Sequence, residues 1–299
     1  MSKLPVLIPG ETIEIPSDCY WVAGQDENLY WWKKPEEQIE QEYLALNLHS
    51  EGISTKKEIP INSSSCLLFA DKDSNLYFGQ TLTIGNRVTV FRQDGDLLWS
   101  WEPDEKINSI AHTVDAHGQF WYVSSDVGFS TTKVEEKAFS VSPGTGLTEY
   151  PFPRIDMVYG IAISEHETIY SNQLPAGHYI LCSDYKGNII HKIGAIDPGK
   201  GDMDNAADWE VFYPENIFLD SKDRLWIDEM GRDCITIVAS NLNIIGRLDH
   251  DDFGLRSPLE TQGRANGKFE YGFGDKLLWV KEARYTPEII LHSYRIEDN

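Results

Sequence analysis

Residues 66–79 read CLLFADKDSNLYFG, and this stretch decides the fold because the chain repeats its pattern six times. Each copy has an apolar strand, a polar turn, and a second strand with an aromatic residue at a fixed place. Successive aromatic residues are 47, 44, 49, 56 and 53 positions apart. A period of about 50 residues along the chain is typical of a repeat architecture. The six aromatic residues are Tyr30, Tyr77, Trp121, Tyr170, Trp226 and Trp279.

A second hydrophobic segment follows most copies, and it carries the signals of another hairpin. Turn residues interrupt four of these segments, at 94–95, 144–146, 186–188 and 241–243. Two hairpins in about 50 residues make one four-stranded sheet, and six such sheets in series make a β-propeller. We therefore predict an all-β fold: a single six-bladed β-propeller domain over residues 1–299, with four-stranded blades.

The two ends of the chain are predicted to meet in the last blade. The sixth copy ends after its third strand, at Ile296, whereas residues 11–15 alternate polar and apolar side chains and belong to no other blade. We expect residues 11–15 to be the outer strand of the last blade, which closes the ring. The acidic segment 35–42 is the one helical candidate. In a propeller, the loops between second and third strands share a face with the connections between blades, and ligands approach there.

Charge and composition exclude several classes of protein. The chain has 299 residues with 48 acidic and 26 basic side chains, a formal net charge of −22. Such a charge repels phosphate backbones and anionic membranes. No apolar run approaches 18 residues, and the N-terminus lacks the features of a secretory signal. The four cysteines show no metal-binding spacing. We expect reduced, buried thiols in a cytoplasmic protein.

The rhythm of an aspartate, a turn residue, a leucine and an aromatic resembles six-bladed NHL-repeat and gluconolactonase-type (SMP-30-like) propellers. The second resemblance implies one divalent metal in the channel, held by a Glu, two Asn and an Asp. Asn108 matches one asparagine, Tyr159 replaces the other, and Glu215 could substitute for the aspartate. The first blade offers no Glu in register. The alternative function is thus a divergent metal-dependent lactonase or esterase with Asn108 and Glu215 as ligands.

Other catalytic patterns are missing from the sequence. The eight histidines are scattered, with no H-E-x-x-H pair, and there is no nucleophile elbow and no phosphate-binding loop. We therefore interpret the chain as non-enzymatic and expect no cofactor.

Acidic and aromatic residues gather in the loops predicted to share one face. The connections 194–214 and 249–268 are long and rich in acids. Aromatic anchors surrounded by acids would supply hot spots together with electrostatic steering. The predicted partner-binding residues are Trp31, Trp32, Glu36, Glu37, Asp126, Asp204, Asp208, Trp209, Asp228, Glu229, Asp251 and Phe253.

A charge of −22 exceeds the magnitude of about 2–8 that keeps a small domain soluble, so a basic partner is the simplest counterpart. The cleft of a nuclease is basic, and an acidic inhibitor can cover it. In architecture, charge and lack of catalytic motifs, the chain is similar to propeller immunity proteins of contact-dependent growth inhibition systems. The leading hypothesis is an acidic, non-enzymatic propeller that neutralises a basic partner such as a toxin RNase.

Overall fold

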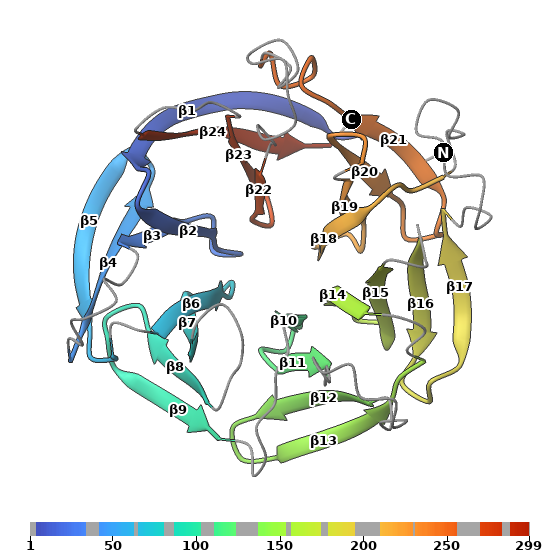
Figure 1. The fold of residues 1–299 in the computed structure, drawn as a ribbon, viewed down its shortest axis with the longest axis horizontal. Helices are drawn as coiled ribbons and strands as arrows, with labels where there is room; N and C mark the ends of the chain where they lie inside the picture. Colours follow the sequence, from blue (N-terminus) through green and yellow to red (C-terminus); the bar gives the residue numbers. More distant parts are fainter. Residues whose placement is uncertain are drawn as a thin grey trace. The chain divides into compact units, whose positions relative to one another are not determined.

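The computed structural model describes residues 4–33, 42–62, 65–80, 87–102, 111–123, 137–153, 157–174, 179–194, 210–229, 231–255, 270–282 and 288–298. These residues form six four-stranded antiparallel sheets, the blades of a six-bladed β-propeller, as the sequence predicts (Figure 1). Across these ranges the chain forms strands and turns, and no helix long and apolar enough to cross a bilayer occurs. The helical candidate at 35–42 lies almost wholly outside the described residues.

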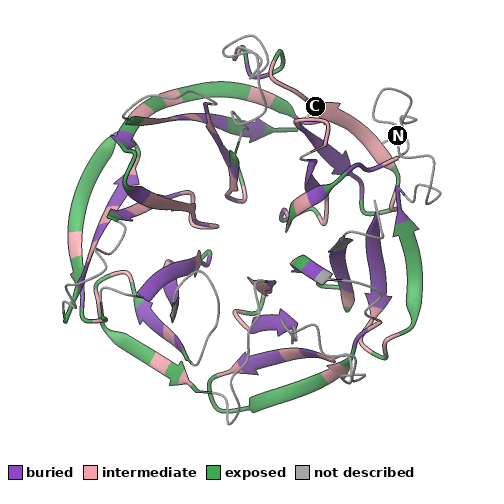
Figure 2. Ribbon diagram, in the orientation of Figure 1, coloured by how far each residue is buried: buried purple, intermediate pink, exposed green. Residues whose placement is uncertain are grey.

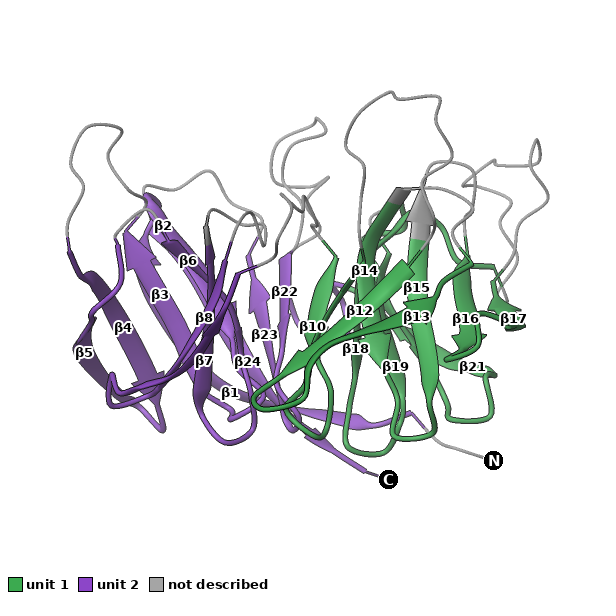
Figure 3. Cartoon of the chain, turned by 90° about the horizontal axis from the view of Figure 1, so that it is seen from below, with its two compact units in different colours: residues 1–2, 105–249 green, residues 3–104, 250–299 purple. Residues whose placement is uncertain are grey.

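The chain divides into two compact units of three blades each, residues 3–104 with 250–299 (unit 2) and residues 1–2 with 105–249 (unit 1) (Figure 3). Each unit holds whole blades, so the division does not cut through a sheet. That the chain is a single domain stays a prediction.

Unit 2 contains blades 1, 2 and 6. Blade 1 has the order β2 (Cys19–Ala23), β3 (Leu29–Lys33), β4 (Leu44–Ser50), β5 (Ile53–Ile59). Blade 2 has β6 (Ser65–Ala70), β7 (Asn75–Gln80), β8 (Val88–Arg92), β9 (Leu97–Trp101). Blade 6 has β22 (Glu270–Phe273), β23 (Leu277–Lys281), β24 (Glu288–Glu297) and then β1 (Val6–Pro16).

Unit 1 contains blades 3, 4 and 5. Blade 3 has β10 (His112–Val114), β11 (Phe120–Val123), β12 (Lys137–Ser142), β13 (Gly146–Pro151). Blade 4 has β14 (Met157–Ile163), β15 (Thr168–Leu174), β16 (Ile180–Asp184), β17 (Ile189–Ile193). Blade 5 has β18 (Pro214–Leu219), β19 (Leu225–Glu229), β20 (Cys234–Val238), β21 (Ile244–Leu248).

The predicted closure of blade 6 by the N-terminal strand is confirmed. Strand β1 pairs antiparallel with β24, placing Ile13 opposite Leu291 and Ile15 opposite Ile289. The strand is longer than the predicted 11–15, and a bulge between Pro9 and Thr12 interrupts its register. The blade is therefore built from both ends of the chain.

The repeated aromatic residues belong to the core, with exposed fractions of 0–5%. In three blades an aspartate at the end of the first strand fixes the aromatic. Its Oδ1 accepts the backbone N–H groups two and four residues later at 2.9–3.0 Å. Its Oδ2 accepts the aromatic side chain six residues later at 2.8–3.1 Å. We call these three residues, Asp71, Asp115 and Asp220, the aspartate clamps. They explain why an aspartate and an aromatic six residues later recur in blades 2, 3 and 5.

Burial follows the position of a strand in its blade (Figure 2). The second and third strands are mostly buried, as in β19 and β20, where every residue is buried. Outer strands such as β13 and β17 are mostly exposed. All four cysteines are free and buried, as the sequence indicates. Burial raises the pKa of Cys66 to about 11 and that of Cys182 to about 12.

Candidate functional site

Two neighbouring inner strands of unit 1 carry bulges at the same end. The register of β14 shifts between Val158 and Gly160, and the register of β18 shifts between Pro214 and Ile217. Tyr159 is the extra residue on β14, and on β18 Glu215 and Asn216 together stand opposite the single residue Asp228. Bulges re-aim side chains and are over-represented next to functional sites. Tyr159 is 39% exposed, Asn216 is exposed and Glu215 is half-buried.

Asn172 on β15 holds these two bulges together. Its side chain is fully buried, and its Nδ2 donates to the carbonyls of Pro214 at 3.0 Å and Glu215 at 2.5 Å. Its Oδ1 accepts the N–H groups of Tyr159, at 3.2 Å, and Gly160. One amide thus uses both its donors and its acceptor to fix irregular backbone on two blades.

A buried carboxylate network lies at the end of β19, where Glu229 pairs with Pro214 beside the β18 bulge. Glu229 has no exposed surface. Its Oε2 accepts the N–H of Phe212 at 2.8 Å, and its Oε1 accepts the Thr236 hydroxyl. Two guanidinium groups flank it, with Arg247 Nε 3.3 Å from Oε1 and Arg232 Nε 3.9 Å from Oε2.

Both arginines are fixed by a second acceptor as well. Arg232 and Arg247 donate to the carbonyl of Glu210 at 3.0 and 2.5 Å. We call the set Glu229, Arg232 and Arg247 the Glu229 network. Burial, with Glu229 close by, raises the pKa of the neighbouring Cys234 thiol to about 12. The network is a paired, hydrogen-bonded charge cluster that holds the end of blade 5 in one arrangement.

The described donors do not fit the divalent metal that the gluconolactonase-type resemblance implies. At the matching positions they offer the Tyr159 phenol, a poor ligand for a hard cation, and the Glu215 carboxylate. Within the described ranges, no three His, Cys, Asp or Glu side chains gather as metal ligands would. Asn108, the remaining candidate ligand, lies outside those ranges.

The expected exposure is wrong for four of the predicted partner-binding residues. Trp32 and Glu229 have no exposed surface, Asp228 is 2% exposed and Phe253 is 4% exposed. Trp32 alternates with Trp31 along β3 and packs on Tyr20 at 5.7 Å in the core of blades 1 and 2. Asp228 accepts Asn216 Nδ2 at 3.4 Å. These side chains stabilise the fold rather than offer contact area.

The other predicted contact residues divide into two groups. Trp31 is half-buried, and the Asp251 side chain is 88% exposed. The remaining ones lie outside the described residues: Glu36, Glu37, Asp126, Asp204, Asp208 and Trp209.

Sequence reasoning missed a polar cluster in unit 2 that joins blades 6 and 1. His49 on β4 is 5% exposed, with Nδ1 2.9 Å from Ser54 Oγ and Nε2 2.8 Å from Glu11 Oε1. Glu11 sits in the β1 bulge, where its N–H donates to Ser293 Oγ at 2.8 Å. Because 38 residues separate Glu11 from His49, no local pattern reveals the pair.

A raised carboxyl pKa gives unit 2 a testable pH dependence. Glu27, in the first turn of blade 1, accepts the N–H of Lys276 at 2.7 Å. Burial, with smaller contributions from Asp275 and Asp26, raises its pKa from 4.5 to about 7. A carboxyl with a raised native pKa stabilises the fold below its unfolded pKa, and this stability is lost as pH rises from 4.5 to 7.

Glu27→Gln keeps the acceptor oxygen and removes the charge. We expect the melting temperature of Glu27→Gln to exceed that of the wild type at pH 8 by about 2–4 °C. At pH 4.5 the two proteins should melt together. Partial exposure of the carboxyl moderates the effect. Calorimetry at both pH values checks this, and a difference that does not change with pH would contradict the assignment.

Comparisons with known proteins show a likeness of fold and do not identify a functional site. No family model matches the chain, and no curated protein matches it. Among solved structures, a catalytically inactive histidine-to-alanine variant of virginiamycin B lyase from Staphylococcus aureus, with quinupristin, is 12% identical. The match covers 95% of this chain and 88% of the lyase, with a TM-score of 0.54.

Two other structures are similar over nearly the whole chain. A luciferin-regenerating enzyme is 11% identical over 99% of this chain and 97% of its own, with a TM-score of 0.54. A member of the DUF4221 family from Bacteroides vulgatus is 10% identical over 100% of both chains, with a TM-score of 0.58. The likeness is one of fold. The neighbours include enzymes and a protein of a family named only as a domain of unknown function.

Proposed function

We propose that the chain is an acidic, non-enzymatic propeller that binds and inhibits a basic protein, with a toxin RNase of the kind met by immunity proteins as the partner. The observation that carries this proposal is the distribution of charge. The sequence has 48 acids against 26 bases. Many cations in the described ranges are already paired with acids of the same chain: Lys33, Arg87, Lys137, Arg224, Arg232, Arg247 and Lys281. Pairing within the chain does not change its net charge, so the excess of 22 acids is what a partner meets.

The turn at 250–255 shows how acids can be presented to a partner. Phe253 is buried against Tyr271 and Tyr294, and its carbonyl accepts the Tyr294 hydroxyl at 2.6 Å. Leu255 N–H donates to the His250 carbonyl at 2.9 Å and closes the turn. Phe253 is thus an anchor rather than a contact, and it fixes a turn on which Asp251 and Asp252 are exposed. A rigid acidic turn loses little conformational entropy when a partner binds.

The direct test is purification of the chain from its native cells together with whatever is bound to it. We expect a basic protein in stoichiometric amount, with nuclease activity that the chain suppresses. Recovery of the chain without such a protein would contradict the proposal.

Charge reversal tests the steering component. The triple variant Asp249→Lys, Asp251→Lys, Asp252→Lys should slow association with the copurified partner by about tenfold or more at low salt. The control variant Asp73→Lys, Glu165→Lys, Glu167→Lys has the same change in charge. Its substitutions lie in the turns between the first and second strands of blades 2 and 4, and they should slow association by less than about threefold. Stopped-flow association rates measure both. Equal rates for the two variants would remove this turn from the interface.

The alternative proposal is a metal-dependent lactonase or esterase. Its ligands would be Asn108, which lies outside the described residues, and Glu215. The observation that favours it is that Glu215 lies in a bulge of β18 that Asn172 joins to the bulge of β14, where Tyr159 replaces the second asparagine of the lactonase pattern. It predicts a divalent cation retained through dialysis and ester hydrolysis that a chelator abolishes. That pair of results would replace the binding proposal.

A further inference from the structure

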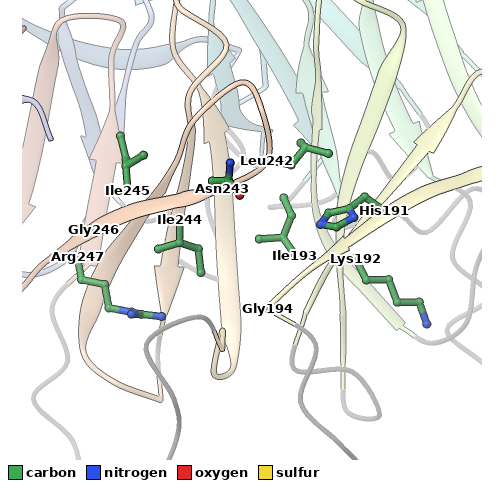
Figure 4. Close-up of a pocket in the computed structure, with 10 residues that line it drawn as sticks. All are labelled: His191, Lys192, Ile193, Gly194, Leu242, Asn243, Ile244, Ile245, Gly246 and Arg247. Carbon is green, nitrogen blue, oxygen red and sulfur yellow. The ribbon is translucent and has the colours of Figure 1, made fainter. Parts of the chain in front are cut away.

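A groove of about 870 Å³ runs between the outer strands of blades 4 and 5 in unit 1 (Figure 4). Strand β17 forms one wall, and β21 with the turn before it forms the other. Each strand ends its sheet, since β17 pairs with β16 and β21 pairs with β20. The groove therefore lies between two strands that end their sheets, and such edges can pair with an added strand.

The floor of the groove is apolar and continuous with the core. Ile193 is 2% exposed and packs with the buried residues shared by blades 4 and 5, and Leu242 and Ile244 pack against the same cluster. Figure 4 shows Ile193 and Ile244 extending toward each other from the two strands. Beside the groove, Ile189 and Ile190 at the start of β17 are 48% and 52% exposed. Apolar side chains of a ligand that binds here would remove both their own surface and the surface of these isoleucines from water.

The charge of the groove is opposite to that of the chain. His191, Lys192 and Arg247 line it, and no Asp or Glu is among the described residues that line it. Two of these cations are held in place: Arg247 by the Glu229 network, and Lys192 with its Nζ 4.7 Å from the centre of the Tyr179 ring. In a protein of net charge −22, a groove whose described lining is basic and uncharged favours negative ligands.

We propose that this groove binds an extended acidic peptide segment of another protein, in which apolar and acidic residues alternate. The side chains of a strand alternate between two directions, so one set would lie on Ile193 and Ile244 while carboxylates meet His191, Lys192 and Arg247. Pairing of the peptide backbone with a strand edge would add main-chain hydrogen bonds. The ligand proposed for this groove is acidic, whereas the partner proposed above is basic. The two proposals are therefore independent of each other.

The test uses synthetic peptides and the whole chain. The probe is a fluorescent LDLDLDL peptide, with LKLKLKL and SDSDSDS as matched peptides that change only charge or only apolar content. We expect saturable binding of LDLDLDL and at least about tenfold weaker binding of the other two. Hydrogen exchange with LDLDLDL bound should show slower exchange at 189–193 and 244–248. Binding without protection at these strands, or equal binding of LKLKLKL, would overturn the proposal.

Variants of the groove complete the test. The double variant His191→Glu, Lys192→Glu should weaken binding of LDLDLDL by about tenfold, because it places two carboxylates in the wall. Lys186→Glu, Lys222→Glu changes the charge by a similar amount on turns outside the groove and should weaken binding by less than about twofold. Circular dichroism checks that both variants fold. Equal affinities for the wild type and the groove variant would show that this groove is not the site.

Discussion

Replacement of Asp220 by alanine is expected to lower the free energy of unfolding by about 3–5 kcal/mol. The Asp220 side chain is an aspartate clamp and is 5% exposed. Its Oδ1 accepts the N–H groups of Lys222 and Arg224, both at 3.0 Å. Its Oδ2 accepts Arg224 Nε at 2.6 Å and Trp226 Nε1 at 3.0 Å. Alanine would leave four donors without this acceptor.

The size of the loss follows from burial rather than from the number of bonds. Trp226 has no exposed surface, so its indole N–H cannot turn to water when the carboxylate is removed. The Arg224 guanidinium lies 5.9 Å from the centre of the Trp226 ring and would lose its counter-charge. A buried donor or charge left without a partner costs its full desolvation penalty.

A matched control is available in blade 4. Asp184 makes the same kind of turn, accepting the N–H groups of Lys186 at 2.9 Å and Asn188 at 2.8 Å. Its carboxylate is exposed and fixes no tryptophan or arginine, although hydrogen bonds from Asn188 lower its pKa. Asp184→Ala should therefore cost far less than Asp220→Ala. Urea denaturation of both variants, with unchanged m-values, measures the difference. Equal midpoints would show that burial does not decide the strength of the clamp.

The clamps also explain why the fold could be predicted from sequence. An acid, a turn and an aromatic six residues later form a local pattern, so blades 2, 3 and 5 can each be recognised within a dozen residues. The pairing of β1 with β24 is not local, yet the alternation of residues 11–15 and the missing fourth strand of blade 6 implied it. In both cases the signal is side-chain period and turn chemistry, which a single sequence carries.

The candidate site could be predicted less well, because burial depends on register and on distant partners. Trp31 and Trp32 are adjacent, and in a strand a shift of one residue exchanges the buried and exposed faces. The sequence could not tell which of the two faces the core. The sequence alone predicts Glu229 to be an exposed acid. Its partner Arg247 lies 18 residues away on another strand, so no local pattern reveals that the two pair. Phe253 is an aromatic residue in an acidic segment, as expected of a contact residue, but Tyr271 and Tyr294 pack against it.

Replacement of Glu229 by glutamine is expected to cost about 3–5 kcal/mol of unfolding free energy, although the side chain keeps its shape. The wild-type carboxylate balances two guanidinium groups while having no exposed surface itself. Glutamine would leave Arg232 and Arg247, whose side chains are 16% and 20% exposed, without the negative charge that both contact. Its amide N–H₂ would also replace one acceptor. The loss of stability would thus arise from positive charge without a counter-charge, because glutamine fills the same space as glutamate.

A double-mutant cycle separates this charge effect from general damage to blade 5. In the Glu229→Gln, Arg247→Gln double variant only one cation remains, so part of the loss should be recovered relative to the sum of the single variants. We expect a coupling of about 1–3 kcal/mol between the two positions. Additive losses would mean that Arg247 acts mainly through the Glu210 carbonyl. Since Arg247 also lines the groove between β17 and β21, the same cycle measures how firmly the end of blade 5 holds that cation in the groove wall.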